Sequence, residues 1–165
     1  MIEQDRTVRA RMGKRNVKDP NERALVLEEL RIPTQVKLAG LWATVMFMYI
    51  YVDIIGFYKP GLIAEIMTGK VWVFDIDQMW MLSMLMLMTV PVLMVFLSLV
   101  LPAKANRYTN VVLGAFHICL AFVTATGEIQ ASYLFGSIVE AVLLCLIVWI
   151  AWKWPTVPRN NVVRN

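Results

Sequence analysis

Four long runs of apolar residues, almost free of charge, constrain this chain more than any other feature. A helix rises about 1.5 Å per residue, so about twenty residues cross the hydrocarbon core of a bilayer, which is about 30 Å thick. Hydrophobic residues make up 59% of the sequence, more than is usual for a soluble domain. We therefore predict an all-α integral membrane protein, an antiparallel four-helix bundle with spans at about 37–58, 79–101, 109–126 and 133–154.

The residues before and after the spans are polar and rich in positive charge. Residues 1–36 are predicted to form a basic cytoplasmic tail that includes a short amphipathic helix at 20–32. A capping residue before this helix and a proline after it support these bounds. Residues 37–155 would form the transmembrane bundle, and residues 156–165 a second cytoplasmic tail.

The distribution of positive charge predicts the orientation. Of the 16 Lys and Arg residues, only Lys59 and Lys70 fall on one side of the predicted spans. Cytoplasmic segments of membrane proteins carry an excess of Lys and Arg. Both termini are therefore expected in the cytoplasm, and the short connections predict an up-down-up-down bundle.

The segments that connect the spans also carry structural signals. The first, about residues 59–78, holds a strand-like run at 71–74 whose aromatic residues suit the membrane interface. The second, at 103–108, is predicted to be a short basic loop. Within the second span, Pro91 removes one backbone hydrogen bond and is expected to kink the helix.

Three ionisable residues, Asp53, His117 and Glu140, fall inside the predicted spans. A charged side chain in lipid costs roughly a few kcal/mol or more, so these groups are expected to face the interior of the bundle. From the helix rise, Asp53 would lie about 7–8 Å below the outer end of its span and Glu140 about 10–11 Å below the same side. At nearly one depth, the two carboxylates could share a proton or jointly hold a cation.

Polar and small residues extend this pattern along single helical faces. On the third span they recur at spacings of three and four, as one helical face requires; they are Asn110, Gly114, His117, Ala121, Thr124 and Glu128. The predicted site is a polar pocket open to the outside that binds a ligand or ion through Asp53, Glu140, Glu128, His117, Tyr49 and Thr124. The alternative is structural: these groups hydrogen-bond one another and only hold the helices in register.

The sequence contains no recognisable catalytic or metal-binding motif. Methionines recur along the second span, and thioethers suit Cu(I), but their alternation with leucine gives no metal-specific spacing. No phosphate-binding loop, zinc-ligand spacing or nucleophile beside a base is present. We therefore predict no cofactor, no metal and no catalytic residue, and an enzyme is the least favoured class.

The N-terminal tail is the part of the chain best suited to bind a charged partner. Its first cations are Arg6, Arg9, Arg11, Lys14, Arg15 and Lys18. Each could contribute about 1 kcal/mol to binding anionic lipid headgroups, or the tail could be solvated and only fix the topology. Besides the bilayer itself, a homo-oligomer is an expected partner because four spans make a thin bundle for a pathway; nucleic acid is not expected.

Several short motifs along the bundle carry a family resemblance. They are Lys37–Trp42, Tyr51–Asp53, Tyr58–Gly61, Leu93–Leu101, Asn106–Arg107, Asn110–Leu113, Gly127–Glu128, Gly136–Glu140 and Ala151–Pro155. Over residues 37–155 the chain resembles a family of small bacterial four-span membrane proteins that carries only a domain-of-unknown-function label. The resemblance implies the four-span fold and a bacterial inner membrane, and names no substrate. Its polar positions are Asp53, Asn106, Arg107, Glu128 and Glu140, whereas His117 and the methionines do not belong to its pattern.

Three functions remain open on these grounds. The first is a multi-pass inner-membrane transporter or channel-like protein in which Asp53 and Glu140 bind a proton, a cation or a cationic solute. The second is a non-enzymatic accessory or scaffold protein that docks a partner or anionic lipid through residues 1–36. The third, and least favoured, is a membrane redox or lipid-modifying enzyme with its site at the outer face.

Overall fold

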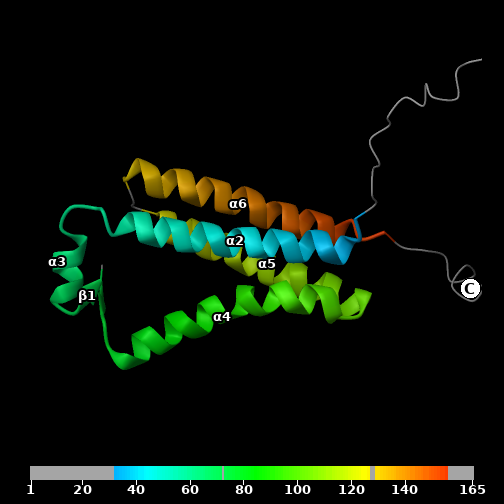
Figure 1. Ribbon diagram of the computed structural model, residues 1–165, viewed down its shortest axis with the longest axis horizontal. Helices are drawn as coiled ribbons and strands as arrows, with labels where there is room; N and C mark the ends of the chain where they lie inside the picture. Colours follow the sequence, from blue (N-terminus) through cyan, green and yellow to red (C-terminus); the bar gives the residue numbers. More distant parts are fainter. Residues whose placement is uncertain (1–31, 72, 127–128, 156–165) are drawn as a thin grey trace, which may run out of the picture. The chain divides into compact units, whose positions relative to one another are not determined.

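The computed structural model describes residues 32–71, 73–126 and 129–155, and four long helices dominate them (Figure 1). These helices are α2 (Thr34–Gly56), α4 (Gln78–Val100), α5 (Ala103–Ala125) and α6 (Ala131–Trp152). By length and composition, all four are long and apolar enough to cross a membrane. The chain is therefore a multi-pass membrane protein built as a four-helix bundle, which confirms the fold class predicted from the sequence.

Consecutive long helices run in opposite directions, so α2 and α5 run the same way (Figure 1). α2 packs against both α4 and α6, and α6 also packs against α5. α4 diverges from the other helices toward its N-terminal end, where every residue of 78–86 except Trp80 is exposed (Figure 1). The first half of α4 is thus the least packed part of the four long helices.

Prolines and one aspartate set the starts of the helices. Pro33 and Pro102 occupy the position just before α2 and α5, where a missing backbone N–H costs no helical hydrogen bond. The Asp77 side chain caps α4 by accepting a hydrogen bond of 2.6 Å from the Trp80 backbone N–H. By contrast, α4 continues through Pro91, which is buried in its interior.

The predicted loop at 103–108 is wrong, because α5 begins at Ala103 directly after Pro102. The charged and amide residues in this stretch are compatible with a helix whose first turns lie near the membrane surface. The correction matters because it places Asn106 and Arg107 on the helix rather than in a turn.

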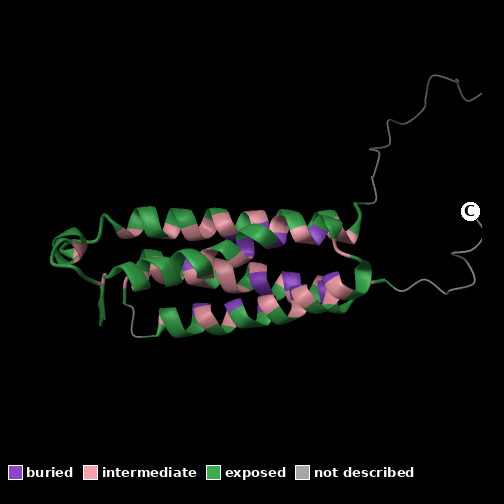
Figure 2. Cartoon of the chain, turned by 90° about the horizontal axis from the view of Figure 1, so that it is seen from below, coloured by how far each residue is buried: buried purple, intermediate pink, exposed green. Residues whose placement is uncertain are grey.

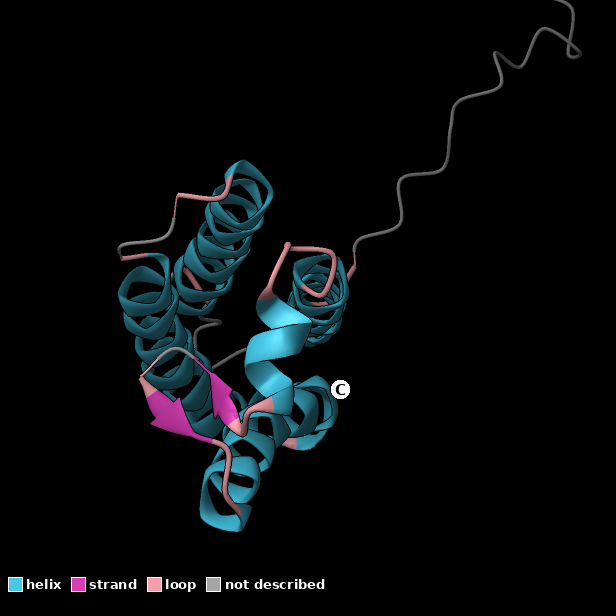
Figure 3. Ribbon diagram, turned by 90° about the vertical axis from the view of Figure 1, so that its left-hand side faces the viewer, coloured by secondary structure: helices cyan, strands magenta, loops and turns pink. Residues whose placement is uncertain are grey.

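The connection between α2 and α4 holds a short helix and a small hairpin (Figure 3). Helix α3 (Leu62–Met67) is followed by strands β1 (Lys70–Val71) and β2 (Phe74–Asp75), which pair antiparallel. The strand-like run predicted at 71–74 therefore begins in β1 and ends in β2. Glycines with positive φ, Gly61 and Gly69, lie at either end of α3 and let the backbone turn there.

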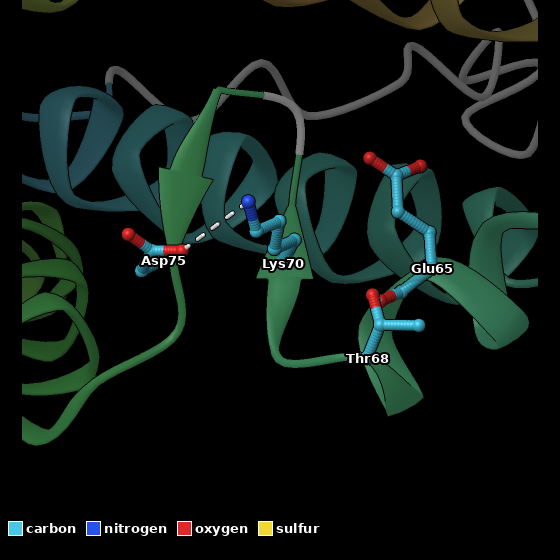
Figure 4. A network of polar contacts seen from close by, with 4 residues as sticks. All are labelled: Glu65, Thr68, Lys70 and Asp75. Carbon is cyan, nitrogen blue, oxygen red and sulfur yellow. Dashed lines mark hydrogen bonds and ion pairs between the residues drawn. The ribbon is translucent and has the colours of Figure 1, made fainter.

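Polar contacts of this connection lie at the surface (Figure 4). Lys70 Nζ lies 3.9 Å from an Asp75 carboxylate oxygen, and both side chains are largely exposed. Thr68 Oγ1 donates a hydrogen bond of 2.6 Å to the Glu65 carbonyl oxygen, which closes the end of α3. These contacts define the hairpin without adding to the core.

The buried residues gather toward one end of the bundle (Figure 2). We call this end the packed half; it comprises residues 34–45, 91–100, 103–117 and 144–152. Its buried apolar core is formed by Leu38, Ala39, Trp42, Val45, Met94, Leu144, Ile147 and Ala151. The open half comprises residues 46–56, 78–90, 118–125 and 131–143, where only Ala121 and Gly136 are buried.

Several predictions concern segments that lie outside the described residues. These are the cations of the N-terminal tail, the C-terminal tail at 156–165 and the amphipathic helix at 20–32, of which only Ile32 is described and is not helical.

Candidate intramembrane polar site

Two glycines bring neighbouring helices into close contact with α6. A Cβ added at Gly136 of α6 would overlap the side chain of Val52 on α2. A Cβ added at Gly114 of α5 would lie 2.7 Å from Cγ2 of Val148 on α6. Small residues at such positions allow helices in membranes to approach closely, and here they fix the register of α6 against both neighbours.

This register places the two candidate carboxylates at different depths. Gly136 is level with Val52, and Glu140 lies four residues, or about 6 Å, further into the bundle. Asp53 lies one residue on the other side of Val52, so the carboxylates are offset by about 7.5 Å along the helix axes. The predicted common depth is wrong, because the open end of α2 is shorter than predicted and that of α6 is longer.

Glu140 nevertheless has two polar neighbours from α2. The Glu140 carboxylate lies close enough to the Tyr49 hydroxyl and the Asp53 carboxylate to interact with both electrostatically, but the Tyr49 hydroxyl lies beyond hydrogen-bonding distance. Tyr49 Oη is buried and has no partner within hydrogen-bonding distance. In the described part of the chain, no Lys or Arg lies within ion-pair distance of either carboxylate. The open half therefore holds acidic groups whose charge nearby described residues do not neutralise.

Of the other two predicted site residues on the third span, only Thr124 is described, and its hydrogen bond stays within its own helix. Thr124 Oγ1 donates a hydrogen bond of 3.1 Å to the Ala121 carbonyl oxygen of its own helix. Glu128, predicted at the mouth of the pocket, lies outside the described residues.

His117 lies at the border between the packed and open halves and is fully buried. Its Nδ1 is 2.9 Å from the Leu113 carbonyl oxygen, whereas its Nε2 has no partner. The ring stands edge-on to those of Trp42 and Phe116, with centroid separations of 5.7 and 5.3 Å. Packing thus holds the imidazole in one orientation and leaves one nitrogen unsatisfied.

A shallow groove lies between the open ends of α2 and α6. Its volume is about 130 Å³, and its wall includes Tyr51, Gln130, Ser132 and Tyr133. Asp53, Glu140 and Tyr49 do not line it. The predicted site residues that the structure brings together are therefore those on α2 and α6, between the helices rather than around this groove.

A polar network that sequence reasoning did not assemble lies in the packed half. Trp42 Nε1 donates a hydrogen bond of 2.7 Å to Asn110 Oδ1, which links α2 to α5. Asn110 Nδ2 donates to the backbone and side-chain oxygens of Asn106, at 2.8 and 2.6 Å. Asn106 Nδ2 donates to the Ser98 carbonyl oxygen at 2.6 Å, and Ser98 Oγ lies 3.4 Å from Asn110 Oδ1. The four side chains are fully buried.

The signal for this network was present in the sequence as two asparagines four residues apart. Residues at that spacing lie on one helical face. Asn106 falls in the loop predicted at 103–108, so that prediction does not place it on one helical face with Asn110. The amide groups bond one another and the backbone, and each side-chain nitrogen and oxygen of the network has a partner, so the network joins the helices.

Cation–aromatic contacts lie at the end of the packed half that is farthest from the open half. The Arg107 guanidinium lies 5.5 Å from the centre of the Trp152 ring, and Lys153 Nζ lies 4.6 Å from that of Trp149. Such pairs of aromatic and basic residues are typical of helix ends at a membrane interface.

Comparison with known proteins adds a family but no activity. Neither a curated protein nor a solved structure matches the chain. A family model described as a family of unknown function (DUF6326) matches residues 28–160, which exceeds the 37–155 of the sequence resemblance at both ends. The match confirms the resemblance to a four-span family without an assigned function. Because it covers most of the sequence, the chain belongs to DUF6326, a family of unknown function.

Proposed function

We propose that this protein binds a proton or a small cation between α2 and α6, at Glu140 and Asp53, as part of a transport function. One observation carries the proposal. Glu140 is half-buried inside a helix able to span a membrane, beside Asp53 and Tyr49, and no described Lys or Arg pairs with it.

The physical argument concerns the cost of charge in an apolar environment. Glu140 lies nine residues from the start of α6, or about 13.5 Å along the helix. An ionised carboxylate at that depth is unfavourable unless a proton, a cation or a polar partner compensates it. Asp53 adds a second negative charge, which strengthens the attraction for a positive ligand.

The charge distribution of the described residues supports an outward-facing site in the plasma membrane. Four of the six described Lys and Arg residues lie at the packed end and two in the connection beyond the open half, whereas all described Asp and Glu residues lie in the open half or in that connection. The positive-inside rule then places the packed end in the cytoplasm, so Asp53 would meet a ligand that comes from outside.

Flux through proteoliposomes tests the proposal. Purified protein would be reconstituted, and proton entry followed with an internal pH dye and sodium entry with a radioactive tracer. We expect Glu140→Gln to reduce the flux to that of empty liposomes and Asp53→Asn to weaken it. The exposed carboxylate variant Asp75→Asn, in the hairpin, is the matched control and should retain full flux.

Two results would overturn the proposal. If the wild-type protein gives no more proton or sodium flux than empty liposomes, transport of these ions is excluded. If Glu140→Gln retains full flux, the carboxylate site is excluded as the ion-binding site, and Glu140 serves only to hold the helices together.

A further inference from the structure

Two buried side-chain atoms of the described residues have no hydrogen-bond partner: Tyr49 Oη and His117 Nε2. Buried polar atoms are nearly always satisfied, either by protein or by ordered water. The neighbouring polar groups on the packed side, such as Asn110, follow that rule completely. Two unsatisfied atoms at the middle of the bundle therefore call for a bound partner.

The partner of Nδ1 defines what His117 Nε2 can do. Nδ1 lies 2.9 Å from the Leu113 carbonyl oxygen, which can only accept a hydrogen bond. In the neutral ring the proton therefore resides on Nδ1, and Nε2 presents a lone pair. That lone pair can accept either a hydrogen bond or a proton.

The helical register brings Tyr49 and His117 to within about one helical turn of each other in height. Trp42 and Asn110, joined by a hydrogen bond, fix the relative positions of α2 and α5. Tyr49 follows Trp42 by seven residues, and His117 follows Asn110 by seven. Because the two helices run the same way, both residues lie about 10.5 Å further along, on the faces that meet at the Trp42–Asn110 bond.

From this juxtaposition we propose that a bound water joins Tyr49 Oη to His117 Nε2, and that His117 is the inner proton acceptor of the Glu140 site. The inference rests on the proposed function and narrows its ligand to a proton. A water at this height would have the Tyr49 hydroxyl, the imidazole nitrogen and the Glu140 carboxylate as partners. Three partners are typical of a buried water.

The proton transfer is balanced without any further reactant. Protonated Glu140 gives its proton to the water, which the Tyr49 hydroxyl holds in place by a hydrogen bond. The water passes one of its protons to the Nε2 lone pair of His117. The products are a Glu140 carboxylate and an imidazolium, with the tyrosine and the water unchanged.

No other titratable group of the described residues is placed to take the proton in place of His117. Between residues 78 and 100, α4 contains no acidic, basic, cysteine or tyrosine residue. Cys119 on α5 and Cys145 on α6 are exposed, and α2 contributes Asp53 beyond Tyr49. The imidazolium would therefore be balanced by the Glu140 carboxylate from which its proton came.

The sequence contains a single histidine, so isotope labelling reports on His117 alone. We would record solid-state nitrogen-15 spectra of the full-length, histidine-labelled protein in liposomes between about pH 5 and 8, where histidine ordinarily titrates. In the wild type we expect a proton on Nδ1, a water-proton correlation to Nε2, and protonation of Nε2 at the acidic end.

Two tyrosine variants, compared by the same spectra, distinguish a specific role of the Tyr49 hydroxyl from a general effect on packing. Tyr49→Phe removes only the hydroxyl and should abolish the water correlation and lower the fraction of Nε2 that is protonated at the acidic end. The control Tyr51→Phe, at an exposed tyrosine on the same helix, should leave both unchanged.

The outcomes separate the relay from the proposed function. If Glu140→Gln abolishes flux but wild-type Nε2 shows no water correlation, or the same one in Tyr49→Phe, the relay is overturned and the carboxylate site stands. If Glu140→Gln retains full flux, the site and the relay both fall. The wild-type spectrum decides on the water even if a variant does not fold.

Discussion

Apart from His117 at their border, the two halves of the bundle differ in whether their buried polar side chains have hydrogen-bond partners. In the packed half, Trp42, Asn106 and Asn110 are fully buried, and each side chain makes a hydrogen bond. In the open half, Tyr49 Oη has no partner, and Glu140 has no described cationic partner. The halves belong to the same four helices, so the difference arises from how closely those helices pack.

This contrast distinguishes polar residues that stabilise the fold from polar residues suited to bind a ligand. A satisfied network gains from burial because every donor finds an acceptor in a low-dielectric surrounding. An unsatisfied acidic cluster costs stability, and proteins keep such clusters mainly where they bind or transfer something. We therefore expect mutations of polar residues to change the free energy of unfolding in opposite directions in the two halves.

The largest effect is expected at the centre of the packed half. Asn110→Ala removes the acceptor of Trp42 Nε1 and two hydrogen bonds to Asn106. We expect a loss of about 3 kcal/mol in the free energy of unfolding, because buried partners are left unsatisfied. Denaturant unfolding in detergent micelles, followed by circular dichroism, measures it. Val112→Ala, at an exposed position of the same helix, is the control; equal stability of the two variants would contradict the structural role.

Glycine substitution tests the packing that sets the register. Gly136→Ala should cost about 2 kcal/mol, since its Cβ would overlap Val52. At Gly40 a Cβ would meet nothing within 4 Å, so Gly40→Ala should be neutral or stabilising by up to about 1 kcal/mol. The same unfolding assay compares them, and a harmless Gly136→Ala would mean that α2 and α6 do not approach as closely as described.

Removing charge from the acidic pair Glu140 and Asp53 should raise the free energy of unfolding rather than lower it. Glu140→Gln keeps the shape and removes the uncompensated charge, so we expect the free energy of unfolding to rise by about 1 kcal/mol. Unfolding of this variant beside Asn110→Ala gives the direct comparison between the halves. A clear loss of stability would show that Glu140 stabilises the fold, as Asn110 does, and would contradict the proposed difference between the halves.

The smallest effect is expected in the hairpin beyond the open half. Lys70→Ala removes an exposed ion pair with Asp75, and such pairs contribute little. We expect a change below about 0.5 kcal/mol, with the unfolding transition of the bundle unchanged. A larger loss would indicate that the connection stabilises the open half from outside.

The spans could be predicted from the sequence because length and apolarity alone meet the requirement of a bilayer. The boundaries were less accurate where polar residues continue a helix beyond the apolar run, as at the start of α5. The short helix α3 was not predicted, since six residues carry too little periodic signal.

The candidate site was predicted residue by residue but not as an arrangement. Asp53, His117 and Glu140 stand out because charge inside an apolar run is rare. Their relative depth was misjudged, because it depends on helix ends and on the Gly136–Val52 contact rather than on spacing along one chain segment. Whether these residues bind a proton or a cation stays a prediction.

By itself, the sequence determined that four helices cross a membrane and that a few ionisable residues lie within them. Both follow from properties of single segments, namely the length of an apolar run and the cost of a charge inside it. Only the tertiary structure decided which polar groups meet. The pairing of Trp42 with Asn110, and the isolation of His117 Nε2, depend on register between helices distant in sequence. That register is set by close contacts at particular side chains, which no single segment encodes.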